Sequence, residues 1–555
     1  MILRFFTNVF IMNANYLFLV LFLESAACLQ INREDNPVFQ LDESHASLGI
    51  YYKDENGTLI TSGHIRPAIF DYNGEIVGYL DAPRPIDSGL VEFKLPTERL
   101  GYFELGVVDA ETKLVPKRGS RPPGRLTYCV VNKPTEADVG RGWFSSIQGT
   151  SLISPEMEGW DTYQFLGISS VGVGYYSWKE VEPLENSREL DHAIHMAKDP
   201  YPKLFAQSKL RPIFYLDAFP NWAVEPNSRS RKDNSFGLPP RNMIEYATYL
   251  TKTIPEIVTK YDFADERIYQ ISWEPNDKWG WFSDDDHLID MYRVAYGVIK
   301  KYDPKARIAG PTIAGAGRAD IETIERLLAR GLIKYIDIIS LHPYPNYPPE
   351  ESYPSALARI KSNVKRAAGR EVPIIATESG YDENSLPGQA ALLDHAYADI
   401  AQAIILAGEG GAGYTWFYLA DNAKDRFGIM YNLTEERRYG PNIVSPKPEF
   451  PMVRQVNDML NGSLKATAIP MKTRGLVGYS FEMNDGSKLT VIWDYTGRNR
   501  SVKLFLGDPQ AVIQDEFGNN IIYKASDPVA VRLSRAPLYI IQNKKYGEFQ
   551  IEGMP

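Results

Sequence analysis

Two glutamates each stand at the end of a strand-like run, a position that suits acid–base or nucleophilic chemistry. In YQISWEPNDKWGW, residues 269–281, alternating side chains predict a β-strand up to Trp273. Pro275 ends that strand because proline brings no backbone N–H. Glu274 is therefore expected at its carboxyl end. In EVPIIATESGY, residues 371–381, Glu378 directly follows an apolar run.

Two carboxylates on one lip of a fold are the equipment for glycoside hydrolysis. One donates a proton to the leaving oxygen while the other attacks the anomeric carbon. Viewed alone, either glutamate is explained as well by a strand-end side chain that bonds a backbone amide or an arginine. The chemical interpretation therefore needs a fold that brings both strand ends to one face.

The middle of the chain supplies such a fold. Between about residues 142 and 419, apolar strand-like runs alternate with helical patterns such as residues 286–302. Eight repeated units favour an α/β fold of the (β/α)8 TIM barrel type over a doubly wound open sheet. The carboxyl ends of barrel strands share one face, so Glu274 on the fourth strand and Glu378 on the seventh would meet there. The runs are GWFSSIQG, ISSVGVGYY, LRPIFYLDA, RIYQISWEP, ARIAGPTI, YIDIISLHPY, VPIIATES and GAGYTWFYL.

Short alternating runs on both sides of this region predict flanking β-sandwich-like domains. We expect an N-terminal β-domain at residues 28–135, the catalytic barrel at 136–460 and a C-terminal β-sandwich domain at 461–555. At 555 residues the chain has room for several domains. The net charge of −10 argues against general affinity for nucleic acid or for anionic membranes.

The first 27 residues are typical of a signal peptide. Arg4 precedes a short apolar run, YLFLVLFL, and the small residues of ESAAC suit a cleavage site. The sequence therefore predicts a secreted or periplasmic protein with no transmembrane segment in the mature chain. Cleavage before Cys28 would allow a lipid anchor there, with a bystander cysteine as the alternative. Cys129 is then the only other cysteine, so no disulfide framework is expected.

Five short motifs, in this order, resemble a clan A glycoside hydrolase, with most likeness to family 39 and related exopolysaccharide-degrading enzymes. The likeness covers roughly residues 142–460, and β-domains like those expected here flank similar enzymes. The motifs are WEPN at 273–276, HPY at 342–344, ATESGY at 376–381, YTWFY at 414–418 and PKPEF at 446–450.

The resemblance implies a retaining, double-displacement glycosidase that acts on a polysaccharide or oligosaccharide. Glu274 would be the general acid/base and Glu378 the nucleophile. An apolar lip that contains Trp273 and Trp279 would help Glu274 to keep its proton. This chemistry needs no metal and no organic cofactor.

The resemblance also suggests a substrate-binding set around the two glutamates. Each member has an ordinary alternative: a core histidine for His342, barrel packing for Trp416, and a loop cap for Asn276. Trp279 and Trp281 would form either a stacking wall for further sugars or a packed loop. The set is Trp273, Asn276, His342, Tyr344, Tyr381 and Trp416.

Two departures from the family pattern affect the sugar that is expected. Trp273 stands where related enzymes place the asparagine that bonds the sugar 2-hydroxyl, and VGVGYYSWKEVEP shows no arginine near the end of the second strand. The first departure permits an unusual or substituted sugar. The basic loop at residues 226–234 is typical of a solvated segment, with contact to an anionic or sulfated glycan as the alternative. A non-catalytic carbohydrate-binding protein and an inverting hydrolase stay open.

Overall fold

The computed structural model forms two compact units. One comprises residues 1–98 with 102–129, and the other comprises 99–101 with 130–555. The expected signal peptide lies outside the described residues except for Ala27, which begins the first strand. The structure describes residues 27–553 except for 32–36, 44–45, 55–63, 73–74, 80–83, 86–89, 110–125, 134–142, 149–159, 188–200, 209, 225–237, 278–279, 387–390, 422–424, 433–443, 522–527 and 544–548.

The N-terminal unit is built from antiparallel strands. β1 (Ala27–Ile31), β3 (Ser47–Asp54) and β7 (Leu90–Lys94) form one sheet. The second sheet has the order β2-β9-β8-β4-β5, with β6 paired to β4. Cys129 in this sheet is buried and free of any disulfide. The second sheet comprises β2 (Val38–Gln40), β4 (His64–Phe70), β5 (Ile76–Tyr79), β6 (Arg84–Pro85), β8 (Gly101–Asp109) and β9 (Leu126–Val131).

The other unit contains a closed barrel of eight parallel strands, which confirms the (β/α)8 prediction. Each strand coincides with one of the eight apolar runs in the sequence. Buried side chains from β10 and from β12 to β16 pack into one apolar cluster. The strands are β10 (Phe144–Ile147), β11 (Ser170–Val173), β12 (Arg211–Tyr215), β13 (Ile268–Gln270), β14 (Arg307–Ala314), β15 (Ile338–His342), β16 (Ile374–Ser379) and β17 (Gly413–Trp416).

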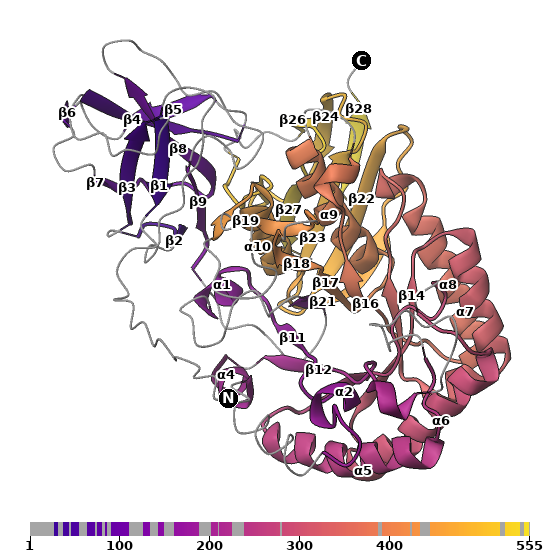
Figure 1. Ribbon diagram of the computed structural model, residues 1–555. Helices are drawn as coiled ribbons and strands as arrows, with labels where there is room; N and C mark the ends of the chain where they lie inside the picture. The colour runs from indigo at the N-terminus through magenta and orange to yellow at the C-terminus, as the bar shows by residue number, and fades with distance from the viewer. Residues whose placement is uncertain are drawn as a thin grey trace, which may run out of the picture. The chain divides into compact units, whose positions relative to one another are not determined.

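Helices connect the barrel strands, and α5 to α8 lie along the outside of the barrel (Figure 1). The acidic segment at residues 284–286 begins α6: the Asp284 side chain accepts a hydrogen bond from the backbone N–H of His287 at 2.8 Å. This confirms the expected helix start. The helices are α1 (Trp160–Phe165), α2 (Trp178–Val181), α4 (Tyr201–Ser208), α5 (Met243–Lys260), α6 (Asp285–Tyr302), α7 (Arg318–Ala329), α8 (Tyr353–Ala368), α9 (Ala391–Gly408) and α10 (Glu449–Leu460).

After the barrel, the chain forms a small sheet and then a β-sandwich. Apolar side chains from β22 to β27 form the core between the two sandwich sheets, as the C-terminal β-texture predicted. The small sheet comprises β18 (Tyr418–Ala420), β19 (Gly428–Asn432) and β20 (Val444–Pro446). The sandwich comprises β21 (Ser463–Ala468), β22 (Leu476–Met483), β23 (Ser487–Asp494), β25 (Val512–Gln514) and β27 (Leu538–Asn543), facing β24 (Arg500–Phe505), β26 (Val529–Leu533) and β28 (Gln550–Gly553).

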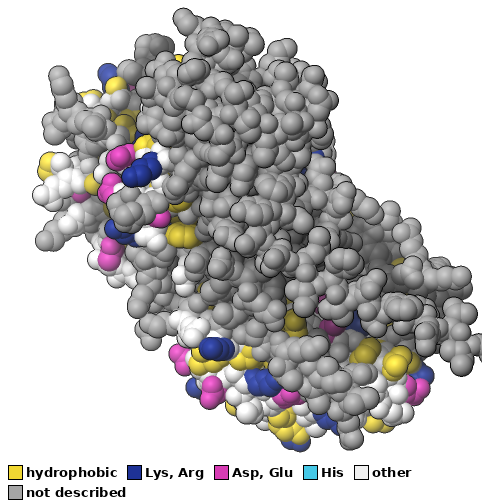
Figure 2. Space-filling model, turned by 60° about the vertical axis from the view of Figure 1, so that its left-hand side comes forward, with side chains coloured by type: hydrophobic (Ala, Val, Ile, Leu, Met, Phe, Trp, Pro, Cys, Tyr) yellow, Lys and Arg dark blue, Asp and Glu magenta, His cyan; other side chains and the backbone are white. Residues whose placement is uncertain are grey.

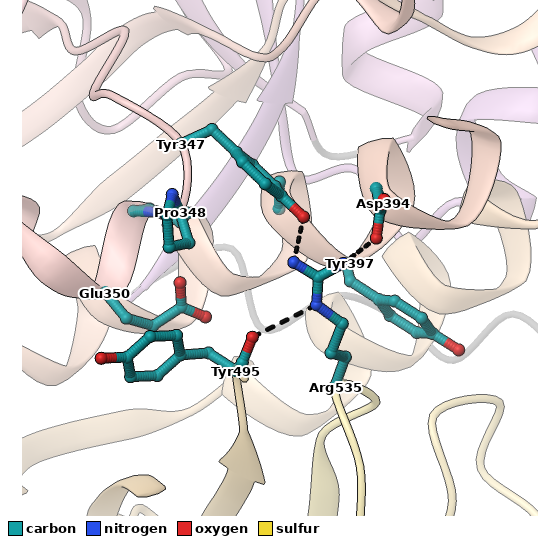
Figure 3. Close-up of a pocket in the computed structure, with 9 residues that line it drawn as sticks. Tyr347, Pro348, Glu350, Asp394, Tyr397, Tyr495 and Arg535 are labelled. Atoms are coloured by element: carbon teal, nitrogen blue, oxygen red, sulfur yellow. Dashed lines mark hydrogen bonds and ion pairs between the residues drawn. The ribbon is translucent and has the colours of Figure 1, made fainter. Parts of the chain in front are cut away.

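Polar contacts join the sandwich to the barrel. Arg535 reaches from the turn between β26 and β27 into a pocket, where it bonds Asp394 on α9 and the hydroxyl of Tyr347 (Figure 3). Beside it, the Trp493 indole N–H donates to Glu350 Oε1 at 2.7 Å. The barrel and the sandwich therefore fold as one compact unit.

The described surface carries charges of both signs. On the face in Figure 2, basic and acidic side chains are interspersed over the described residues without a patch of one sign. None of the described helices is both long enough and apolar enough to cross a bilayer.

A buried ion pair holds the strand that precedes Glu274. Arg267, which precedes β13, forms a bidentate pair with Asp303 at 2.6 and 3.0 Å, and the Tyr269 hydroxyl donates to the same carboxylate at 3.0 Å. Both charged side chains are under a tenth exposed. Because the pair is desolvated, loss of one partner would leave an uncompensated buried charge.

We predict that Asp303→Asn lowers the free energy of unfolding by about 3 to 5 kcal/mol. Urea denaturation measures this loss. Arg293→Ala is the control, since its pair with Asp290 is more than half exposed and its loss should cost less than about 0.5 kcal/mol. Equal effects of the two substitutions would contradict the role of burial.

Candidate active site

Glu274 follows β13 in a constrained backbone conformation. Its φ is 42°, in the left-handed region that side chains other than glycine rarely adopt. Its N–H donates to the carbonyl of Thr312 at 3.0 Å. A Cβ on Gly280 would lie 1.5 Å from the Glu274 carbonyl oxygen, so only glycine permits the loop to return this closely. These contacts fix the direction of the Glu274 side chain.

Glu378 is the penultimate residue of β16 and is 4% exposed. The Tyr344 hydroxyl donates to its Oε1, and the Gln148 side chain also hydrogen-bonds the carboxyl group. Its other oxygen has no hydrogen-bond partner among the described residues. Glu378 is thus buried with donors on one side and with one oxygen free to react.

His342, the last residue of β15, lies between the two glutamates. Its Nδ1 is 2.9 Å from Glu274 Oε1 and 3.8 Å from Glu378 Oε2. One ligating atom from each of the three side chains lies within 4.8 Å of the others, a donor set that a metal ion would also accept. The rings of Trp273 and His342 pack in a T-shaped arrangement, with centroids 4.8 Å apart.

Burial dominates the electrostatics of this group. Burial is the largest influence that raises the pKa of Glu378, and the charge of Glu274 adds to it, while His342 and the donors Tyr344 and Gln148 oppose them. The net pKa is about 7. For His342, burial lowers the pKa, but the carboxylates of Glu378 and Glu274 together raise it above its ordinary value. The expected nucleophile therefore has a raised carboxyl pKa.

Asn276 performs a structural task. Its amide donates to the carbonyl of Ala314 at 2.7 Å and to Asp320 Oδ1 at 2.9 Å, while its Oδ1 accepts from the N–H of Ala314 at 2.9 Å. These bonds tie the loop after β13 to the end of β14 and to the first turn of α7. They support the loop-holding alternative over a contact with substrate.

The other predicted aromatics differ in their access to the site. Trp416 is 1% exposed and donates its indole N–H to Ser145 Oγ at 3.0 Å, which supports barrel packing. Tyr381 is buried in a cluster with Leu386 and Ala398. Trp281 donates to a backbone carbonyl at the start of α6. Trp279 and the basic loop at 226–234 lie outside the described residues.

Three residues near the glutamates were missed in the sequence. Asp217 follows β12, is buried, and accepts a hydrogen bond from Gln270 at 2.8 Å. Burial raises its pKa to about 6. Tyr215 at the end of β12 packs on Trp273, and Gln148 follows β10. The rule that pointed to Glu274 and Glu378, a polar residue just after a barrel strand, also applies to Asp217 and Gln148.

Comparisons with known proteins agree with this architecture. Neither a protein-family model nor a curated protein sequence matches the chain. Among solved structures, a family 39 glycoside hydrolase from the gut symbiont Bacteroides cellulosilyticus WH2 superposes with a TM-score of 0.63 at 14% identity, covering 93% of this chain and all of that one. The chain has the fold of a family 39 glycoside hydrolase. A monomeric β-xylosidase from Caulobacter crescentus CB15 gives a TM-score of 0.50 at 13% identity, covering 74% of this chain and 98% of that one.

The raised pKa of Glu378 makes a prediction about stability. Folding raises this pKa from 4.5 to about 7, so the native state binds the proton more tightly than the unfolded state. The stability that this group contributes is therefore fully present below about pH 4.5 and is lost as the pH rises through about 7. The buried carboxylate should cost on the order of 3 kcal/mol above that range.

Glu378→Gln should consequently raise the melting temperature at pH 8 and change it little at pH 5. Thermal unfolding at the two pH values measures the difference. Glu322→Gln on the exposed face of α7 is the control and should show no pH-dependent gain. A gain at pH 5 that equals the gain at pH 8 would be inconsistent with a desolvated carboxylate.

Proposed function

We propose that this chain is a retaining glycoside hydrolase that cleaves a polysaccharide or oligosaccharide by double displacement. The observation that carries the proposal is the pair Glu274 and Glu378 at the carboxyl ends of β13 and β16, with oxygens within 4.8 Å of each other. Retaining enzymes hold the two carboxyl groups about 5 to 5.5 Å apart, whereas inverting enzymes need about 6.5 to 9.5 Å to admit a water. The short separation supports retention.

Glu378 has the surroundings of a nucleophile. Donors from Tyr344 and Gln148 favour its charged form, while burial removes the water that would weaken its attack. In the first step its oxygen would bond the anomeric carbon as the glycosidic bond breaks. Glu274 would give its proton to the leaving oxygen at the same time.

The second step reverses the proton transfer. Water would attack the glycosyl-enzyme, Glu274 would take the proton from that water, and the bond to Glu378 would break. The 2.9 Å contact between His342 Nδ1 and Glu274 Oε1 holds the carboxyl group whether the shared proton lies on the nitrogen or on the oxygen. The Nε2 of His342 is buried without a hydrogen-bond partner among the described residues, so it is available to a sugar hydroxyl.

The substrate and the location of the protein are part of the proposal. The structurally similar Caulobacter protein is a β-xylosidase, so xylosides belong in the first substrate panel. Trp273, which stands in place of the usual asparagine, favours inclusion of substituted sugars, and the basic sequence at residues 226–234 is the reason to include anionic glycans. Export directed by residues 1–27, with Cys28 as a lipid anchor or a bystander, stays a prediction from the sequence.

A carbohydrate-binding protein without catalysis is the second candidate. The buried Trp416 favours it, because it leaves little open ring surface under the reacting sugar. Trp273 also favours it, because it stands in place of the asparagine that bonds the sugar 2-hydroxyl in related enzymes. Incubation with the panel separates the two functions. A hydrolase releases new reducing ends, whereas a binding protein only retards its migration in a gel that contains the glycan.

Substitution of each glutamate tests the assigned roles. Glu378→Ala removes the nucleophile, so activity should fall by several orders of magnitude on every substrate. Glu274→Ala removes the proton donor, so the loss in the first step should be smaller for an aryl glycoside with a good leaving group. Added azide should restore turnover of the Glu274 variant and yield a glycosyl azide of retained configuration, which NMR identifies.

A different pattern of azide rescue would exchange the roles of the two glutamates. If azide instead revived the Glu378 variant and gave a glycosyl azide of retained configuration, Glu378 would be the acid/base and the two roles would be exchanged. Leu464→Ala in the exposed part of β21 serves as the activity control. It should retain full turnover.

The pH profile tests which charges surround the nucleophile. Glu378 must be ionised to attack, so kcat/KM for an activated aryl glycoside should fall as pH drops below about 7. Tyr344→Phe removes a hydrogen bond that lowers this pKa, so the acid limb of the profile should move to higher pH. An acid limb that stays in place or moves to lower pH in this variant would rule out Glu378 as the titrating group.

A further inference from the structure

A second buried cluster of ligating side chains lies outside the proposed active site. His395 and Asp399 are one turn apart on α9, and Glu449 is the first residue of α10. All three are at most 2% exposed. His395 Nδ1 is 3.0 Å from Glu449 Oε2, and His395 Nε2 is 3.6 Å from Asp399 Oδ2.

Most polar atoms of this cluster have no hydrogen-bond partner among the described residues. The atoms are both imidazole nitrogens of His395, Oδ1 of Asp399, and both carboxylate oxygens of Glu449. Buried polar groups in folded proteins are nearly always satisfied. His395 Nδ1 and Glu449 Oε2 lie 3.0 Å apart without the alignment of a hydrogen bond. Both atoms are therefore placed to bind a further group.

The neighbouring Lys447 forms ion pairs with acidic residues outside this cluster. Lys447 Nζ lies 2.8 Å from Asp421 Oδ1 and 3.3 Å from Glu383 Oε2. Its single positive charge faces these two acids, so the carboxyl groups of Asp399 and Glu449 need a further positive charge between them. That charge is either a proton or a cation.

A shared proton is the simpler arrangement, and it has some support. Burial raises the pKa of Glu449 to about 8 and raises the pKa of Asp399 well above its ordinary value, which favours a proton on this pair of acids. One proton, however, joins only two oxygens. It leaves both nitrogens of His395 unsatisfied, whereas a metal ion takes one atom from each of the three side chains.

We propose that His395, Asp399 and Glu449 form a binding site for a divalent transition metal ion such as Zn²⁺. One nitrogen and two carboxylate oxygens lie within 4.8 Å of one another. An imidazole with carboxylates suits zinc and related ions better than magnesium or calcium. Tetrahedral zinc separates its ligand atoms by about 3.4 Å, so binding would draw the most distant pair together.

The site would serve structure in the neighbourhood of Glu378. Asp399 accepts a hydrogen bond from the backbone N–H of Tyr381. On the same helix, Gln402 accepts from the hydroxyl of Ser379. The ion would therefore brace α9 and α10 behind the segment that follows Glu378, and burial on all sides favours this structural role over a catalytic one.

Metal content and location test the proposal without reference to activity. The full chain is dialysed against Zn²⁺, freed of excess ion and measured by mass spectrometry, and it is also loaded with Co²⁺ for visible spectroscopy. The wild type should hold about one zinc ion per chain, show the bands of tetrahedral cobalt and lose melting temperature on treatment with a chelator.

Variants locate the ion. His395→Gln and Glu449→Gln should each reduce the zinc content at least about tenfold, while Asp421→Asn, a buried neighbour outside the ligand set, should keep it. Glu274→Gln should also keep it, which excludes the triplet around His342 as the site. If the His395 variant fails to fold, the cobalt spectrum of the wild type and the Glu274 variant still decides.

Two results would overturn the proposal. The first is a wild type that retains neither zinc nor cobalt and ignores the chelator, which leaves the shared proton as the arrangement of the cluster. The second is zinc that disappears in Glu274→Gln and persists in His395→Gln, which assigns the ion to the other triplet. Neither result bears on the proposed hydrolase activity, because that chemistry uses no metal.

Discussion

Two buried carboxyl groups held within 4.8 Å of each other are the constraint on which the rest of this site depends. Like charges at that distance in a desolvated place cannot both be ionised at low cost. In this fold His342 lies between the two carboxyl groups, and the side chains of Tyr344 and Gln148 donate hydrogen bonds to Glu378. The residual cost appears as the raised pKa of Glu378, which leaves this group able to gain or lose a proton near neutrality.

The barrel makes such an arrangement possible because its strands end on one face, and the connecting loops then fix each side chain. Glu274 accepts a left-handed backbone conformation that Thr312 and the close return of Gly280 maintain. The side chain of Asn276 makes hydrogen bonds to the backbone of Ala314 at the end of β14. Strain at Glu274 is thus stabilised by loops that do not themselves take part in the chemistry.

The same electrostatic problem recurs behind the site. His395, Asp399 and Glu449 place two acids and an imidazole in an interior from which water is excluded, where α9 meets α10. α9 also contacts the sandwich through Asp394 and Arg535 (Figure 3). One helix therefore links the segment after Glu378, the second polar cluster and the C-terminal sheets, which explains why the barrel and the sandwich form one compact unit.

The amino-acid sequence by itself determined the eight strands, the barrel and the two strand-end glutamates, because alternation, proline and apolar runs act over a few neighbouring residues. Only the tertiary structure decided which side chains touch. In the tertiary structure His342 contacts Glu274, and Asn276 makes structural hydrogen bonds instead of facing a substrate. Trp416 is buried, while Asp217 and Gln148 lie near the site. The tertiary structure also set the raised pKa on Glu378, since burial and the charges that act on a carboxyl group come from strands far apart in the chain.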